Sequence, residues 1–180
     1  MSVTTIVIFI VFSLIHLYAY YNLNKKNRNL EKKSALISFV FILVVLIAVR
    51  SAVIIITDFV FIITMISLTA HNYLGYVVDL YKSSRTFDRY LHVFGSFSFA
   101  LFFFSIISSL LITSESRFYN SMFVFTLGMT LGVINEIVEF SIDQKKGTNT
   151  QKGHKDTNID LICNAIGSFV AACISYIFLI

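Results

Sequence analysis

Six long apolar segments, separated by short polar stretches, constrain this 180-residue chain more than any other feature. A helix needs about 20 apolar residues to cross about 30 Å of hydrocarbon, and the bilayer interior admits only helices and closed barrels. The predicted spans are residues 2–21, 34–51, 55–79, 90–112, 121–140 and 159–180. The boundary between spans two and three is open, because only Arg50 and Asp58 interrupt a long apolar run. We therefore predict an all-α polytopic membrane helix bundle, forming a single membrane domain over residues 1–180.

Composition agrees with this class, since 57% of residues are hydrophobic and only 13% are charged, about half the charged share of a soluble domain. The net charge of +4 does not indicate nucleic-acid binding, because the basic residues occupy short loops between spans. Cys163 and Cys173 share one span and are separated by about 15 Å of helix rise, too far to pair with each other.

The basic residues predict the orientation of the chain. Twelve of the 14 follow spans one, three and five: Lys25, Lys26, Arg28, Lys32, Lys33, Lys82, Arg85, Arg89, Lys145, Lys146, Lys152 and Lys155. Cytoplasmic loops carry such an excess, so we expect both termini outside the plasma membrane. The basic loops would then face anionic lipids.

Acidic residues and one histidine gather at the predicted cytoplasmic ends of spans three to six. The candidate site residues are Asp88, His92, Glu136, Glu139, Asp156 and Asp160, with His71, Asp79, Asn164 and Asp143 as supporting residues. In the fifth span, Gly128, Gly132, Glu136 and Glu139 share one helix face, and the two glycines form a small-xxx-small contact. Similar stripes on the other spans predict a shared cavity open to the cytoplasm.

These groups suggest a metal site, because charges at membrane depth usually pair or bind a ligand. Asp88 and His92 are one helical turn apart, as are Glu136 and Glu139. Oxygen ligands with one imidazole suit Mg²⁺, Mn²⁺ or Fe, and Zn²⁺ is also compatible. Asp88, His92, Glu136, Glu139 and Asp160 would be the ligands.

Simpler explanations exist for several of these residues. Asp88 and Asp156 are favoured at helix N-termini by capping and the helix dipole. His71 is compatible with an interior histidine that has its hydrogen bonds satisfied. Asp143 lies in a loop, where solvation is enough to account for it.

Three motifs of the second half resemble YjdF-like bacterial inner-membrane proteins. They are the FDRxxH pattern at residues 87–92, GxxxExxEF at residues 132–140, and QxG followed by DTxxDxxxNxxG at residues 151–167. A polar motif at His71–Gly75 accompanies them, and a tryptophan common in the second motif is replaced by Asn135. VanZ-like membrane proteins are more distantly similar. The resemblance implies a polytopic plasma-membrane protein and supplies no reaction.

Two functions of different classes, and one structural role, remain open. The first is a metal-dependent enzyme on lipid or polyprenyl head groups, in which the candidate residues bind metal or act as general acid and base. The second is a cation- or proton-coupled transporter that uses the same carboxylates. The third is an accessory protein whose polar cluster only holds the bundle together. The oligomeric state is left open.

Overall fold

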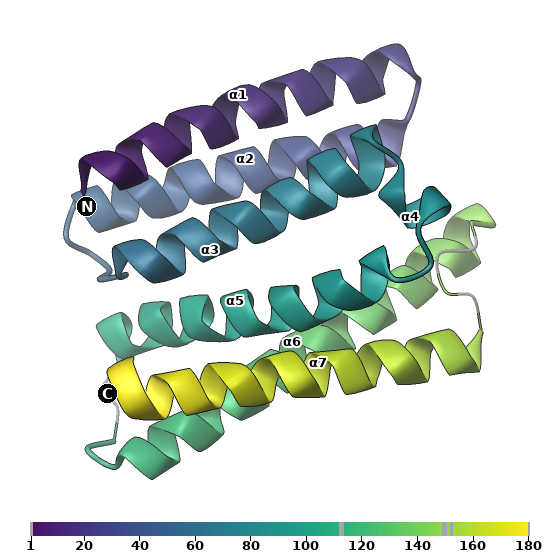
Figure 1. The fold of residues 1–180 in the computed structure, drawn as a ribbon. Helices are drawn as coiled ribbons and strands as arrows, with labels where there is room; N and C mark the ends of the chain where they lie inside the picture. The colour runs from purple at the N-terminus through teal and green to yellow at the C-terminus, as the bar shows by residue number, and fades with distance from the viewer. Residues whose placement is uncertain (1, 112–113, 149–150, 152, 180) are drawn as a thin grey trace. The chain divides into compact units, whose positions relative to one another are not determined.

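The computed structural model describes residues 2–111, 114–148, 151 and 153–179 (Figure 1). Its helices are α1 (Val3–Lys25), α2 (Asn29–Arg50), α3 (Asp58–Thr69), η1 (Ala70–Val77), α4 (Leu80–Ser83), α5 (Phe87–Leu110), α6 (Arg117–Lys146), α7 (His154–Ile174) and η2 (Ser175–Leu179). With α3 joined to η1 and α7 to η2, six helical stretches are long and apolar enough to cross a membrane. The predicted all-α fold with six spans is confirmed. The predicted boundary residues Ile112, Thr113 and Ile180, and the basic residue Lys152, lie outside the described residues.

Five of the six helical stretches extend beyond their predicted segments at one end or both, whereas the third, Asp58–Val77, is shorter than the predicted 55–79. The first runs to Lys25 instead of residue 21, and the fifth extends from Arg117 to Lys146 instead of residues 121–140. Hydropathy marks only the part that fits the hydrocarbon, whereas backbone hydrogen bonds continue into polar residues. This fifth span is α6, which ends at Lys146. The next residue, Gly147, has a positive φ of 63°, which suits glycine at a helix C-terminus.

Contacts divide the chain into two units, which are described separately. The first unit runs to Leu91 and includes Ser105–Leu111, and the second comprises His92–Phe104 and the chain that follows Leu111. The single membrane domain over residues 1–180 stays a prediction, as does the cavity shared by spans three to six.

In the first unit, α1, α2 and α3 lie side by side (Figure 1) around buried apolar side chains such as Phe12 and Met65. A polar network is buried among them, centred on Asn72 of the π-helix η1. The Asn72 amide donates to Ser38 Oγ at 2.9 Å and lies 3.5 Å from His16 Nε2. Three different helices therefore share one set of hydrogen bonds, which replaces the water that hydrocarbon lacks.

A second contact of the first unit joins two polar turns. Arg28, between α1 and α2, donates at 2.6 Å both to the Tyr76 carbonyl and to Asp79 Oδ1, and it also bonds Glu31. Burial acts to lower the pKa of Arg28, but the hydrogen bonds to Asp79 and Glu31 outweigh it and the pKa is raised. Arg28 thus ties the α1–α2 turn to the end of η1.

In the second unit, α6 and α7 pack along each other (Figure 1), and glycines stand where helices approach most closely. A Cβ at Gly128 would collide with Ser168, and one at Gly132 would lie 2.5 Å from Cγ of Asn164. A Cβ at Gly167 would meet the backbone carbonyl of Val93 on α5. The predicted small-xxx-small contact at Gly128 and Gly132 is confirmed, and it brings the α6 and α7 polar residues within reach of each other.

Candidate functional site

His92 is at the centre of the candidate site in the second unit. It lies near the start of α5 and is 9% exposed. Its Nδ1 is 3.3 Å from Oδ1 of Asn164 on α7, a residue that is itself 2% exposed. Because a carbonyl oxygen only accepts, Nδ1 carries the proton in this contact, which in a neutral ring leaves a lone pair on Nε2.

The second ring nitrogen of His92 faces a carboxylate of α6. Nε2 lies 3.7 Å from Oε1 of Glu136, which is 5% exposed. Glu139, one turn later on the same helix, offers an oxygen within 4.8 Å of the ligand atoms of both. We call His92, Glu136 and Glu139 the ligand triplet. The structure thus brings three of the predicted ligands together from two helices.

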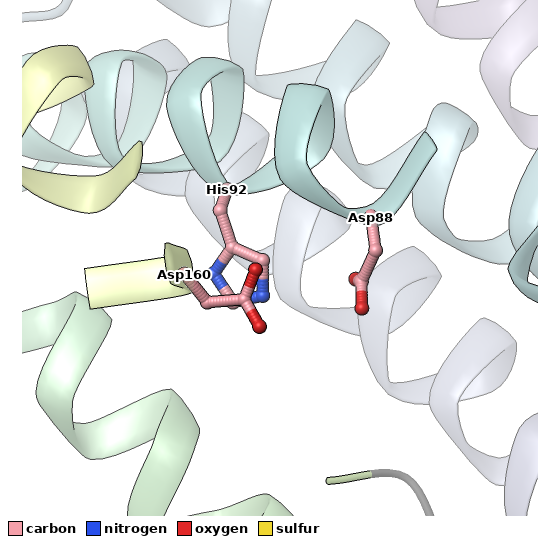
Figure 2. A group of neighbouring side chains, drawn as sticks. All are labelled: Asp88, His92 and Asp160. Carbon is pink, nitrogen blue, oxygen red and sulfur yellow. The ribbon is translucent and has the colours of Figure 1, made fainter. Parts of the chain in front are cut away.

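Asp160 of α7 approaches His92 from a third helix. One of its carboxylate oxygens lies within 4.8 Å of a ring nitrogen of His92, and Asp160 is 4% exposed. Figure 2 shows the two side chains beside each other, with Asp88 one turn earlier on the same side of α5. Asp88 is half-buried and offers an oxygen within 4.8 Å of His92. The boundary between the units falls inside α5, after Leu91. Asp88 therefore belongs to the first unit, and it is described with His92 because both residues lie on the same helix.

These ligands lie at one end of the second unit. Its α5 begins, its α6 ends and its α7 begins at that end (Figure 1). His92 is five residues from the start of α5 and Glu136 is ten from the end of α6. At 1.5 Å per residue, the cluster is about 8–15 Å from the helix ends. Both α5 and α6 extend past their apolar segments at this end, so the cluster lies near the polar end of those segments.

The other candidate residues have different surroundings. Asp156 is half-buried in the first turn of α7, one turn before Asp160. Asp143 lies in α6 and is half-buried, so its predicted position in a loop was wrong, because the helix continues past the apolar segment. Its carboxylate holds the chain after α6, since it accepts from the Thr148 hydroxyl at 2.5 Å and from the Gln151 backbone N–H at 2.9 Å. Neither belongs to a group of three potential ligands in the part of the chain that the structure describes.

The two supporting residues from the third predicted span belong to the first unit. His71 Nδ1 lies 2.6 Å from the Tyr81 hydroxyl, and the His71 ring packs edge-on against Tyr76. Asp79 accepts a hydrogen bond from Arg28. Both residues therefore make their contacts within the first unit, near the end of η1.

Two residues beside the ligand triplet were missing from the predicted site. Gln151 donates from Nε2 to both the backbone carbonyl and Oε2 of Glu136, at 3.0 and 3.1 Å. Asn135 donates from Nδ2 to Oε1 of Glu139 at 2.8 Å. The spacing of Asn135 and Glu139, one helical turn, was a usable signal. Gln151 begins the third family motif, but nothing in the sequence predicted its contact with Glu136, because that contact depends on how the α6–α7 connection folds back.

The arrangement has the ligand chemistry of a divalent cation site. With bonds of about 2.1 Å, neighbouring ligand atoms lie about 3.4 Å apart around a tetrahedral cation and about 3.0 Å apart around an octahedral one. His92 Nε2 and Glu136 Oε1 are 3.7 Å apart, so a cation would draw the two side chains together by a few tenths of an ångström. A ligating histidine usually donates its other N–H to an oxygen, as His92 does to Asn164. The residues present therefore fit a bound cation.

The fold and the cluster define a multi-pass α-helical membrane protein with carboxylates and an imidazole buried at one end of its spans. The chain lies in a lipid bilayer. Residues 3–180 match the family described as "Predicted membrane protein (DUF2238)", and the chain belongs to that family.

One relative extends this comparison. A protein of Thermotoga maritima, described as "Uncharacterized protein", is 35% identical over 116 residues, which are 61% of this chain and 58% of the relative. The match therefore spans little more than half of the relative's length. No solved structure matches the chain.

Proposed function

We propose that this protein is a membrane-embedded, metal-dependent enzyme that acts on a lipid or polyprenyl head group. His92, Glu136 and Glu139 would hold a divalent cation, with Asp160 and Asp88 completing the ligand set. A bound cation of this kind supplies Lewis acidity toward a phosphoryl or carbonyl oxygen. Mg²⁺, Mn²⁺, Fe and Zn²⁺ are the candidates, because the ligands are oxygens with one imidazole.

One observation carries the proposal. His92 Nε2 faces Glu136 Oε1 at 3.7 Å, and both side chains are buried inside the protein. With the ring proton on Nδ1, a neutral ring would turn an electron-rich nitrogen toward a carboxylate oxygen. That pair is favourable only with a proton or a cation between them. A cation also accounts for the nearby carboxylates of Glu139 and Asp160, whose like charges disfavour one another.

The depth of the cluster supports a substrate that belongs to the membrane. A site about 8–15 Å from the helix ends is reached from the head-group region of a lipid more directly than from bulk water. The general acid and base would be carboxylates of this end that do not bind the cation: Asp156 first, and Asp88 or Asp160 where either is not needed as a ligand.

The orientation and the lipid contacts are part of the same proposal. If the basic loops are cytoplasmic, the cluster lies in the cytoplasmic leaflet of the plasma membrane, and the lysines of these loops would attract anionic lipids. The motifs that resemble YjdF-like proteins support one shared site, because they contain His92, Glu136 and Asp160. We expect no nucleic-acid partner.

Metal analysis of the detergent-purified protein tests this function. We expect about one divalent cation per chain in the wild type and a large loss in Glu136→Gln and Asp160→Asn, which are nearly isosteric. Absence of metal from the wild type would refute the enzyme proposal. Bound metal combined with cation uptake into proteoliposomes, abolished by Glu136→Gln, would favour the transporter instead.

A further inference from the structure

Each member of the ligand triplet is hydrogen-bonded to a side-chain carboxamide. Asn164 accepts from His92 Nδ1 at 3.3 Å, Gln151 donates to Glu136 Oε2 at 3.1 Å, and Asn135 donates to Glu139 Oε1 at 2.8 Å. The three amides come from three different places: α7, the α6–α7 connection and α6. We propose that Asn135, Gln151 and Asn164 form an outer shell that positions the ligand triplet for a divalent cation. This inference rests on the proposed metal site. It gives Asn135 and Gln151 a positioning role, which the family motifs do not indicate.

The geometry of Glu136 gives the first argument. Gln151 occupies Oε2, while Oε1 is the oxygen that faces His92 Nε2 at 3.7 Å. The carboxylate is therefore divided, with one oxygen held by the protein and the other directed toward the ring. An outer-shell partner of this kind orients a ligand and fixes which of its atoms binds. Glu136 would then bind a cation through one oxygen.

The charge of the shell gives the second argument. A carboxamide is neutral, so its hydrogen bonds fix the carboxylates of Glu136 and Glu139 without cancelling their charge, as a guanidinium would. With a neutral His92, the triplet carries two negative charges, which match a divalent cation. His92 and Glu136 are buried, so the charge balance of the site matters more than it would at a surface.

A buried donor beside the triplet also points to a ligand. Asn164 is 2% exposed, and its Nδ2 has no hydrogen-bond partner in residues 2–111, 114–148, 151 and 153–179. A buried amide donor of this kind usually bonds a protein group or an ordered water. An oxygen from a ligand or from its hydration shell would satisfy it.

The shell also connects the site to the end of the membrane domain. Asp143 accepts from the Gln151 backbone N–H at 2.9 Å, and the Gln151 side chain then reaches Glu136. The orientation of Glu136 therefore depends on the α6–α7 connection through the side chain of Gln151. Asn135 needs no such connection, since it lies on the same helix as Glu139.

Titration of the metal-free protein with Co²⁺ in detergent tests the outer shell. The variants are Gln151→Leu and Asn135→Leu, which keep side-chain length or bulk and remove the amide. The matched control is Gln144→Leu, because Gln144 lies on α6 near Gln151 and makes no hydrogen bond to the triplet in the described part of the chain. We expect Kd for Co²⁺ to rise about 10–100-fold in each of the two variants and to stay unchanged in the control.

The visible absorption of bound Co²⁺ separates positioning from folding. A carboxylate released from its amide is free to bind through both oxygens, so the d–d bands of the two variants should change in intensity while those of the control do not. Wild-type affinity and spectrum in both variants would overturn the outer shell and leave the metal site intact. Weaker binding explained entirely by a lower melting temperature of the metal-free variants would also overturn it. No Co²⁺ binding by the wild type would overturn the proposed function together with this inference.

Discussion

Gly132→Ala should disturb the site through packing alone. A Cβ at Gly132 would lie 2.5 Å from Asn164 Cγ and 2.8 Å from Asn164 Cβ, whereas ordinary contacts begin at 3.4 Å. Asn164 would have to move by about 0.9 Å, and rotating its side chain cannot relieve the contact at its own Cβ. The Asn164–His92 hydrogen bond is already 3.3 Å long, so this movement would break it.

The expected change in the free energy of unfolding follows from three terms. Overpacking costs about 1–3 kcal/mol, and the better helix propensity of alanine returns up to about 1 kcal/mol. The lost hydrogen bond adds roughly 0.6 kcal/mol, the average measured for such bonds within membranes. We therefore expect a net loss of about 1–3 kcal/mol, visible as a lower melting temperature in detergent, together with weaker divalent metal binding.

Gly128→Ala is the matched control. It adds the same methyl group to the same face of α6, one turn away, but there the new Cβ meets Ser168 and Ala100. Among the described residues, the Ser168 hydroxyl donates to the Asn164 backbone carbonyl, which does not take part in the Asn164–His92 hydrogen bond. We expect Gly128→Ala to lower the melting temperature and to leave metal binding unchanged. The reasoning fails if Gly132→Ala melts and binds metal like the wild type, or if both variants lose metal equally.

Two further predictions concern the first unit and the orientation of the chain. Arg28→Gln should lower the free energy of unfolding by about 1 kcal/mol, because it removes a partly exposed ion pair with Asp79. Lys82→Gln is the control: the Lys82 ammonium is 3.8 Å from Asp79 and largely exposed, so its loss should not change the melting temperature. The pKa of Arg28 is raised, so the stability that its ion pair contributes is fully present below the ordinary guanidinium pKa. The stability difference between the wild type and Arg28→Gln should therefore be the same from about pH 6 to about pH 9. A difference that disappears within this range would contradict the Arg28–Asp79 ion pair. In a background without the native cysteines, an impermeant maleimide should label Glu115→Cys in intact cells and reach Lys26→Cys only after permeabilisation; the opposite pattern would reverse the topology.

The six spans could be predicted because membrane insertion depends on the summed hydropathy of a continuous segment, to which each apolar residue contributes independently of the rest of the fold. Length and hydropathy suffice to find such a helix, whatever its neighbours are. The shared face of Glu136 and Glu139 could be predicted for a related reason, since helical periodicity places residues one turn apart on one side. The glycines beside them indicated that this side packs against another helix.

Helical periodicity missed one fully buried polar residue of the third span, where the helix is not α. Counting in steps of four from Ser67 predicts His71 as the inward polar residue of the third span. In the structure, η1 is a π-helix with a wider turn, and Asn72 is fully buried while His71 is half-buried. The polar network with Ser38 and His16 was therefore not foreseen.

Contacts between residues far apart in the sequence were also out of reach. Arg28 and Asp79 are separated by 51 positions, and Gln151 meets Glu136 only because the chain reverses direction after Gly147. Composition places each of these residues in a polar turn but does not say which turn meets which. The candidate site was predictable in its ligands and not in the amides that hold them.

The nitrogen ligand of a bound cation offers the most direct test of the proposed metal site. Pulsed electron paramagnetic resonance of the purified protein with one equivalent of Mn²⁺ should show ¹⁴N coupling from the imidazole of His92. The coupling should disappear in His92→Gln, while Gly128→Ala should retain it. Bound Mn²⁺ without nitrogen coupling in the wild type, or the same coupling in His92→Gln, would contradict the site at His92, Glu136 and Glu139.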